Sequence, residues 1–392
     1  MKILFYRYGS ICEPDIIEAM NTLGIDVVCI TKEVYDKSVT PQHTIQLLQD
    51  AFNSNSFDAV FSINFYPAIA EVCNIYHIRY ICQSVDSPVL ELFSHSICRE
   101  WNRIFLFDHE QFLELSGYNS GHIFYLPLAT NISRWDSVLN EMNKDAVSRY
   151  SHNIAFVGSL YTEKSPYDKV SKLPQYINGY LNGLMAAQLQ IYGSFIIEEL
   201  LPDEVISEYK KNYPGFYDAG KSSYLTDRKL LAQFYIGNKL SSLERAECMK
   251  RLSSIYDVDI YTGSNTDAFP HLINHGFAKT HTEMPLIFRN SKINLNITSR
   301  AIRSAIPLRV WDILGCGGFC LTNYQSELTD YFVPGEHLDY YDSMDSLMDK
   351  TEYYLSHDKE RRDIAENARE LIRSGHTWTD RIELMIETAF SC

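Results

Sequence analysis

The 392-residue sequence lacks the patterns that mark membrane and nucleic-acid-binding proteins. No run approaches the ~18 apolar residues of a membrane-spanning helix. Acidic residues outnumber basic ones by 50 to 35, and no stretch is rich in lysine and arginine. The net charge of -15 opposes docking on DNA, RNA or an anionic membrane surface. A small anion such as a nucleotide diphosphate is not excluded, because backbone N–H groups can bind it locally.

The nine cysteines form no CxxC pair and no Cys/His cluster at the spacing of metal ligands. Most fall in apolar runs, including Cys29, Cys73, Cys82 and Cys320, which predicts buried free thiols. Free thiols are typical of a reducing compartment. The N-terminal MKILFYRYGS is too short and too polar for the apolar core of a signal peptide. We therefore expect a cytoplasmic protein.

Two common catalytic motifs are also absent. Without GxGxxG a dinucleotide site is not expected, and without GxSxG nothing marks a hydrolase. Asp257-Val258-Asp259 imitates a DxD metal motif, but it begins a predicted strand, VDIYTG. We predict no metal site and no cofactor.

The pattern that is present is an alternation of strands and helices. In the first 130 residues, helical segments separate the short apolar runs KILFY, IDVVCIT, DAVFSI, RYICQSV, RIFLFD and HIFYLPL. Such alternation predicts an α/β fold in which a parallel sheet has helices on both faces.

A second alternating region follows a polar stretch. Residues 131–150 read as a linker, and NIAFVGSLY then opens a new sheet. About 165–255 is helical, strands resume at VDIYTG, and the chain ends in helices. We predict domains over 1–135 and 136–375, with a helical insertion in the second, and a final helix over 376–392.

One helix, PLRVWDILGCGG, carries a charged pair on one face. Pro307 suits its first turn, and its N-terminus can bind phosphate. Arg309 could clamp a diphosphate and Asp312 could accept hydrogen bonds from a ribose diol. Alternatively the two form an ordinary intrahelical ion pair. Gly317 and Gly318 permit a sharp turn and a close approach of backbone to a ligand.

From Lys292 to Tyr324 the sequence resembles the C-terminal signature of GT-B glycosyltransferases, specifically the CgeB-type (spore maturation protein) branch. The matching stretch is KINLNITSRAIRSAIPLRVWDILGCGGFCLTNY, and HEQFLELSGYNSGHIFYLPLATN, NIAFVGSLY and HTWTDRIELMI extend it in the same order. The resemblance implies two Rossmann-like domains facing a cleft. The first would bind the acceptor, the second a nucleotide sugar, and the last helix would pack back on the first domain, with Trp378 as a hydrophobic anchor.

The sequence departs from that family at two positions. The family usually has Glu where this chain has Asp312. The other glutamate of the retaining relatives, about two turns earlier, falls near Ser304. The two-glutamate pattern therefore transfers only in part.

Strand ends supply further donor-binding candidates. The loop with Gly158 and Ser159 corresponds to one that binds phosphates in the family. The nearest basic residue to this loop is Lys164. Tyr261, Gly263 and Asn296 also end predicted strands. Each of these positions is equally explained as an ordinary turn.

Acceptor-side candidates lie in the loops of the first domain. Asp86, in QSVDSP, is similar to an acidic loop residue of the family and could act as a base or bind the acceptor; its alternative is an Asx turn before proline. Arg7 and Glu13 lie in the first strand-to-helix loop.

These observations predict a metal-independent hexosyltransferase that uses a nucleotide-diphosphate sugar. Asp86 and Arg309 are the catalytic candidates. By resemblance a UDP- or dTDP-sugar and a retaining reaction are favoured, with a protein, glycan or small molecule as acceptor. A nucleotide-sugar epimerase or hydrolase, and a non-catalytic nucleotide-sugar-binding partner of another transferase, remain alternatives. The oligomeric state is not predicted.

Overall fold

Two parallel sheets of six strands each organise the computed structural model, which describes residues 1–163, 165–170 and 172–391. The chain divides into two compact units. The N-terminal unit comprises Met1–Thr130, Ala219–Leu225 and His376–Cys392, and the C-terminal unit comprises Asn131–Asp218 and Thr226–Gly375. The predicted α/β class with two parallel sheets is confirmed.

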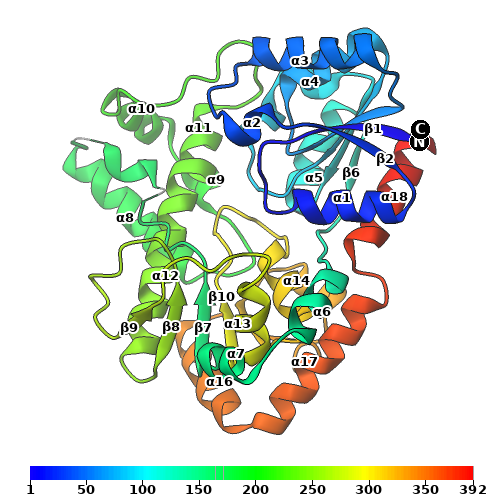
Figure 1. The fold of residues 1–392 in the computed structure, drawn as a ribbon. Coiled ribbons are helices and arrows are strands. Elements are labelled where there is room, and N and C mark those ends of the chain that lie inside the picture. Colours follow the sequence, from blue (N-terminus) through cyan, green and yellow to red (C-terminus); the bar gives the residue numbers. More distant parts are fainter. Residues whose placement is uncertain (164, 171, 392) are drawn as a thin grey trace. The chain divides into compact units, whose positions relative to one another are not determined.

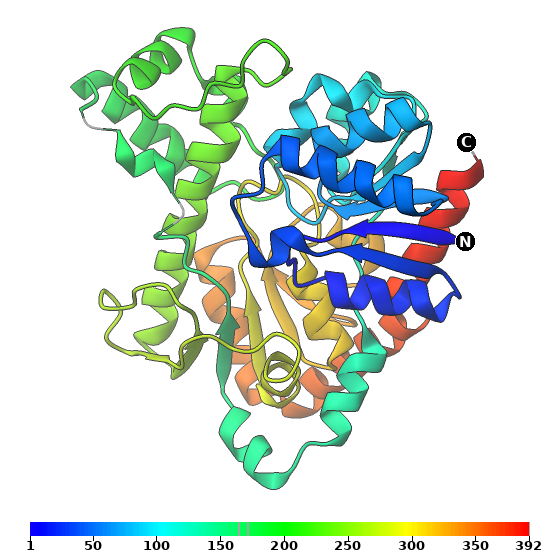
Figure 2. The ribbon, with the colours of Figure 1, turned by 45° about the horizontal axis from the view of Figure 1, so that its top comes forward.

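The sheet of the N-terminal unit has the strand order β2-β1-β3-β4-β5-β6. Its strands are β1 (Lys2–Tyr6), β2 (Asp26–Ile30), β3 (Ala59–Ile63), β4 (Arg79–Gln83), β5 (Asn102–Leu106) and β6 (Ile123–Tyr125). Its helices are α1 (Glu13–Thr22), α2 (Lys32–Tyr35), α3 (Pro41–Ser54), α4 (Pro67–Tyr76), η1 (Leu90–Phe93), η2 (His95–Cys98), α5 (His109–Leu115), η3 (Ser116–Tyr118) and α18 (Trp378–Ser391). Helices α1 and α18 cover one face of this sheet and α3 and α4 the other (Figures 1 and 2).

The last helix, α18, forms hydrogen bonds with the rest of the N-terminal unit near both of its ends. Trp378, at its start, is buried and donates its backbone N–H to Thr130 O (3.1 Å). Near its end, Ala389 O accepts a hydrogen bond from Arg79 Nε (3.1 Å). The prediction that Trp378 is a buried anchor is confirmed.

A short segment, Ala219–Leu225, also belongs to the N-terminal unit although both of its flanks belong to the C-terminal unit. Ser222 O accepts the backbone N–H of His95 (3.0 Å), and Phe93 O accepts that of Tyr224 (2.7 Å). The sequence analysis places all of 165–255 in the second domain and does not predict this segment.

The sheet of the C-terminal unit has the order β12-β11-β10-β7-β8-β9. Its strands are β7 (Ile154–Val157), β8 (Val258–Tyr261), β9 (Leu272–Asn274), β10 (Ile293–Asn296), β11 (Cys320–Asn323) and β12 (Asp339–Tyr341). Its helices are α6 (Ile132–Asn140), α7 (Lys144–Tyr150), η4 (Pro166–Lys169), α8 (Gln175–Leu189), α9 (Ile197–Leu200), α10 (Asp203–Lys211), α11 (Asp227–Lys229), η5 (Leu230–Ile236), α12 (Gly237–Ser253), α13 (Met284–Asn290), α14 (Leu308–Gly315), α15 (Leu328–Tyr331), α16 (Met344–Ser356) and α17 (Asp358–Arg373).

Alternating side chains of this sheet point to two different layers, as the period of a strand requires. One layer is an apolar core in which Ile154, Ile260 and Leu295 of the strands pack with residues of α12 and α16 such as Met249 and Leu347. The other layer contains α13 and α14, which pack on β7, β10 and β11. Polar strand residues therefore face α13 and α14.

One expectation from the sequence is wrong, and another is confirmed only in part. Residues 131–150 do not form a linker: they fold into α6 and α7, which pack on α13, and Trp135 of α6 is buried. The expected burial of free thiols is confirmed for six of the eight cysteines described, whereas Cys29 and Cys98 are exposed. Cys29 is exposed because β2 is the edge strand of its sheet.

Among the described residues, no helix combines the length and the apolar character that crossing a bilayer requires.

Candidate functional site

The carboxyl edge of the C-terminal sheet gathers most of the predicted donor residues. Because its strands are parallel, the loops after β7, β8 and β10 emerge at one edge, where ligands of such sheets bind. Gly158 and Ser159 follow β7, Gly263 follows β8, and Asn296 ends β10. The next helix, α14, also begins at this edge.

The loop after β7 is tightly hydrogen-bonded within itself. The Ser159 hydroxyl donates to Glu163 Oε1 (2.7 Å) and accepts the backbone N–H of Tyr161 (2.8 Å). Burial raises the pKa of Glu163, but hydrogen bonds from Ser159, its own backbone N–H, Ser264 and Thr162 lower it to about 2. A phosphate at Ser159 would have to displace this carboxylate. Lys164 lies outside the described residues.

Arg245, on α12, joins the loops after β7 and β10. Its guanidinium is buried and donates to the backbone oxygens of Ser159 and Ile297. It also lies over the ring of Tyr161, 4.3 Å from the centroid. Sequence reasoning missed this residue, because LERAECMKRL reads as an ordinary charged helix face.

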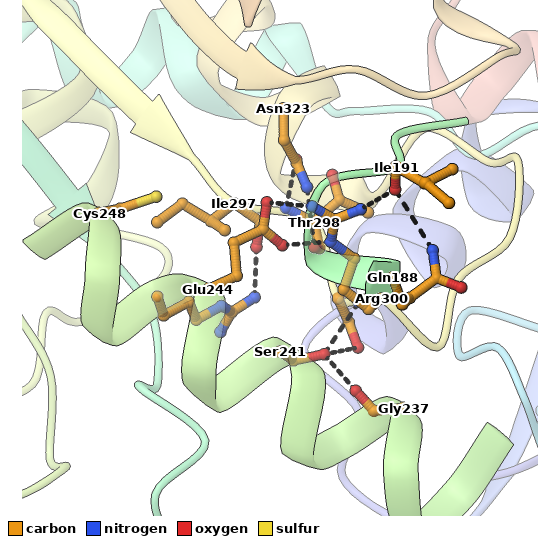
Figure 3. A network of polar contacts seen from close by, with 12 residues as sticks. Gln188, Ile191, Gly237, Ser241, Glu244, Cys248, Ile297, Thr298, Arg300 and Asn323 are labelled. Atoms are coloured by element: carbon orange, nitrogen blue, oxygen red, sulfur yellow. Dashed lines mark hydrogen bonds and ion pairs between the residues drawn. The ribbon is translucent and has the colours of Figure 1, made fainter. Parts of the chain in front are cut away.

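A second buried arginine anchors the loop between β10 and α14. Arg300 pairs with Glu244 through Nε (2.6 Å) and Nη2 (2.9 Å), and it donates through Nη1 to Ile191 O (2.7 Å). Its backbone N–H donates to Ser241 Oγ (2.9 Å). Figure 3 shows the guanidinium between Glu244 and the Ile191 carbonyl. Burial lowers the pKa of Arg300, but Glu244 outweighs burial, so the pKa is raised.

The same loop is fixed to β11 from its other side. Thr298 N–H donates to Asn323 Oδ1 (2.7 Å), and Asn323 Nδ2 donates to Thr298 O (3.1 Å). Ser304 donates its hydroxyl to Glu327 Oε1 (2.6 Å). The path from β10 into α14 is therefore held by hydrogen bonds along its length.

Asn296, by contrast, uses its amide inside the fold. Its Nδ2 donates to Thr322 Oγ1 (2.8 Å) and Thr298 Oγ1 (3.0 Å), and the side chain is buried. These contacts explain the residue without a ligand, so donor binding by Asn296 stays a prediction.

Helix α14 begins one residue later than predicted. Pro307 is its cap residue, in an extended conformation, and Leu308 is the first helical residue. Arg309 is half-buried against α13, where Nη1 contacts Met284 Sδ (2.9 Å) and the guanidinium lies 5.5 Å from the Phe288 ring centroid. Asp312, one turn further, is only 5% exposed. Arg309 lies in the first turn of α14, next to the carboxyl edge, and Asp312 lies just past the middle of the helix. Their contact with a donor stays a prediction.

Gly317 and Gly318 lie elsewhere. Helix α14 runs away from the carboxyl edge, so the two glycines precede β11 at the opposite, amino edge of the sheet. Gly317 has φ +70, and a Cβ on it would meet Arg289 Nη1 at 2.2 Å. The structure thus separates this pair from the other donor candidates and explains it by packing against α13.

We expect Gly318→Ala to lower the free energy of unfolding by about 1–3 kcal/mol. Its new Cβ would stand 2.4 Å from Phe288 O and 2.7 Å from Asn294 Nδ2. Urea denaturation measures the loss. The control is Gly183→Ala in α8, which meets nothing within 4 Å and should be neutral or stabilising by about 0.5–1 kcal/mol. Equal losses in the two variants would refute the packing explanation.

The remaining donor candidates, Tyr261 and Gly263, lie at the end of β8. Tyr261 turns its side chain onto the sheet, where its hydroxyl meets His152 Nε2 (2.8 Å) and its ring stacks on His275. Only its backbone reaches the loop: Tyr261 O accepts Gly158 N–H (3.1 Å). Gly263 lies under the ring of Phe277. A Cβ added to Gly263 would stand 2.0 Å from Cζ of that ring.

In the N-terminal unit, the acceptor-side candidates follow β1 and β4. Glu13 is buried and accepts the backbone N–H groups of Tyr8 (2.8 Å) and Gly9 (2.7 Å) and Arg7 Nε (2.9 Å). This carboxylate shapes the β1–α1 loop rather than meeting solvent. Asp86 is exposed and accepts from Asn64 Nδ2 (2.7 Å), so its carboxylate is available to a ligand.

Comparisons with known proteins concern the fold and the C-terminal part of the chain. The model of a family described as glycosyl transferase-like matches residues 245–387, and a search of curated proteins returned no match. Anabaena HepE in complex with UDP has a TM-score of 0.56 at 11% identity, with 100% of both chains covered.

Two synthases have the same architecture. Sucrose-phosphate synthase from Thermosynechococcus elongatus has a TM-score of 0.56 at 10% identity, covering 100% of this chain and 99% of that one. A UDP-forming α,α-trehalose-phosphate synthase from Burkholderia xenovorans has a TM-score of 0.53 at 11% identity, with the same coverage. At these identities the likeness establishes the fold alone, and the fold is GT-B.

Proposed function

We propose that this chain is a glycosyltransferase that binds a nucleotide-diphosphate sugar at the carboxyl edge of its C-terminal sheet and transfers the sugar to an acceptor. The observation that carries the proposal is the match of residues 245–387 to a glycosyl transferase-like family. That range contains Arg245, the β10–α14 loop and α14, which form this edge. The matched solved structures include HepE with UDP and with UDP-glucose, which favours a UDP-sugar donor.

Fixed positive groups would stabilise the departing diphosphate. The N-terminus of α14 carries a partial positive charge, which favours an anion beside its first turn. Arg309, in the first turn, supplies a full charge, and the neighbouring loop offers the backbone N–H of Ser159, whereas that of Gly158 already donates to Tyr261 O. Preorganised charges of this kind stabilise a leaving group without a metal ion. We therefore propose metal-independent transfer.

Arg245 and Arg300 would act as positioning residues. Both are buried, and both hold the loop between β10 and α14. Holding the loop before the donor arrives avoids ordering it during binding, which preserves affinity.

Asp312 is proposed to accept hydrogen bonds from the ribose diol, and exposed Asp86 to act as the base or to bind the acceptor. Because Asp312 is almost fully buried, a ribose would reach it only through a small movement of the neighbouring side chains. The retaining course, the CgeB-type branch and a cytoplasmic location are parts of the proposal that rest on resemblance and on the free cysteines.

Thermal unfolding in the presence of UDP, dTDP, GDP and their sugars tests donor binding. We expect one nucleoside diphosphate to stabilise the wild type, by about 2.7 kcal/mol at 100 times its Kd. Asp312→Asn, which keeps the shape but removes the charge, should weaken that binding by about tenfold or more.

The matched control is Asp345→Asn, because the Asp345 side chain is 93% exposed on α16 of the same unit. It should bind like the wild type. No stabilisation by any nucleotide would refute the proposal. Release of free sugar in the absence of an acceptor would identify a hydrolase instead, and donor binding without turnover would identify a non-catalytic partner.

A further inference from the structure

Three side chains that are distant in sequence meet on the α13 side of the C-terminal sheet. His152 precedes β7, Asp259 lies within β8, and His275 follows β9. Asp259 Oδ1 lies 3.1 Å from His152 Nδ1 and 2.7 Å from His275 Nε2. All three candidate ligand atoms lie within 4.8 Å of one another.

Two of the three side chains in the cluster, one of them a carboxylate, are largely buried. The Asp259 side chain is 11% exposed and that of His152 only 7%. The two imidazoles lie within hydrogen-bonding distance of this carboxylate. A buried carboxylate is stable only when it is compensated. A cation held by all three groups would compensate it directly.

The ring of His152 is already oriented for ligation. Its Nε2 meets the Tyr261 hydroxyl (2.8 Å), which leaves Nδ1 directed at Asp259. A hydrogen bond to the second ring nitrogen is how proteins commonly fix a metal-binding imidazole. The stacked rings of Tyr261 and His275, 4.7 Å between centroids, hold the third member beside it.

A pocket of about 560 Å³ gives access to the cluster. His152 and Asp259 line it, together with Asp257, Ser291, Lys292 and Arg361. These neighbours precede β8 and β10 or belong to α17, so the pocket opens at the amino edge of the sheet. The pocket therefore opens at the edge of the sheet opposite to the loops proposed to bind the donor.

We propose that one divalent transition-metal ion is bound by His152, Asp259 and His275, with Zn²⁺ as the representative ion. Two imidazoles and one carboxylate are a donor set that Zn²⁺ takes, with a water molecule as the fourth ligand. Zn²⁺ bonds of about 2.0–2.2 Å to these atoms require only small movements of the side chains. This proposal departs from our expectation from the sequence that the chain has no metal site.

The ion would be structural rather than part of the transfer reaction. It would join the segment after β9, a three-residue edge strand, to β7 and β8. The test therefore measures metal binding itself and does not depend on the proposed glycosyltransferase activity.

The experiment uses the full-length chain, freed of any affinity tag and stripped with a chelator, and titrates it with Zn²⁺ and Co²⁺. We expect one saturable equivalent, visible d–d absorption of the Co²⁺ form, and an X-ray absorption spectrum with only nitrogen and oxygen ligands. His275→Ala should abolish that equivalent. Tyr261→Phe, which frees the His152 ring, should weaken it by roughly 10–100-fold.

His271→Ala is the matched control, because His271 is exposed just before β9, outside the cluster, and this variant should bind as the wild type does. Circular dichroism of the metal-free variants establishes that each is folded. The proposal is overturned if no saturable equivalent binds, if His275→Ala binds as tightly as the wild type, or if the spectrum shows sulfur ligands from the free cysteines.

Discussion

Replacing Glu244 by alanine is expected to lower the free energy of unfolding by about 3–5 kcal/mol, the cost of leaving one partner of a buried ion pair unpaired. The Glu244 side chain is 0% exposed and that of Arg300 is 8% exposed. Without the carboxylate, the guanidinium of Arg300 would keep only its bond to Ile191 O among the contacts shown in Figure 3. Chemical denaturation followed by fluorescence measures the loss.

The control for Glu244→Ala lies one turn away on the same helix. Glu247 pairs with Arg251 at the surface, with both side chains more than 40% exposed, so Glu247→Ala should cost about 0.2–1 kcal/mol. Replacing both Glu244 and Arg300 by leucine should recover much of the stability, since a buried pair can be exchanged for apolar side chains. If Glu244→Ala cost no more than Glu247→Ala, the pair would not be buried in solution.

The Glu244 variant also connects stability to the proposed site. Arg300 belongs to the loop that leads into α14. Loss of its ion pair with Glu244 would therefore make the segment before the first turn of that helix less ordered. We expect the donor affinity to fall in any Glu244 variant that still folds, whereas Glu247→Ala should leave it unchanged.

Arg309→Ala is expected to lower kcat for sugar transfer about 100-fold, the usual effect of removing one preorganised group that stabilises developing charge. Arg309→Lys should recover part of the loss, because it keeps the charge but not the planar fork of donors. Steady-state kinetics with the donor identified by thermal unfolding measures both.

A suitable control for Arg309 is Arg362→Ala, since that side chain is 77% exposed on α17 at the opposite edge of the sheet. It should leave kcat unchanged. If Arg309→Ala retained full activity while its fold was intact, the proposed role of α14 in stabilising the diphosphate would be wrong.

The strands that carry apolar runs could be predicted because burial on both faces leaves a continuous signal in the sequence. Strand β9, with the three residues Leu272–Asn274, leaves no such run and was missed. The sequence of helices α6 and α7 is polar and is typical of a linker, although Trp135 buries a large side chain there.

Pairings between distant residues could not be predicted from one sequence. Glu244 and Arg300, or Asp259 with His152 and His275, become neighbours only when the strand order is known. The motif around α14 is recognisable in the sequence, but the sequence alone groups Gly317 and Gly318 with the donor residues. An eight-residue helix spans about 12 Å, so residues at its two ends lie at opposite edges of the sheet.

The course of the chain between its two units has a practical consequence. The polypeptide passes from one unit to the other after Thr130, Asp218, Leu225 and Gly375. A fragment that stops at Thr130 lacks α18 and the Ala219–Leu225 segment, and so exposes the surface of α1 on which α18 packs. Neither unit can therefore be removed or exchanged at a single junction. A chimaera that keeps the N-terminal unit would have to include all three of its segments.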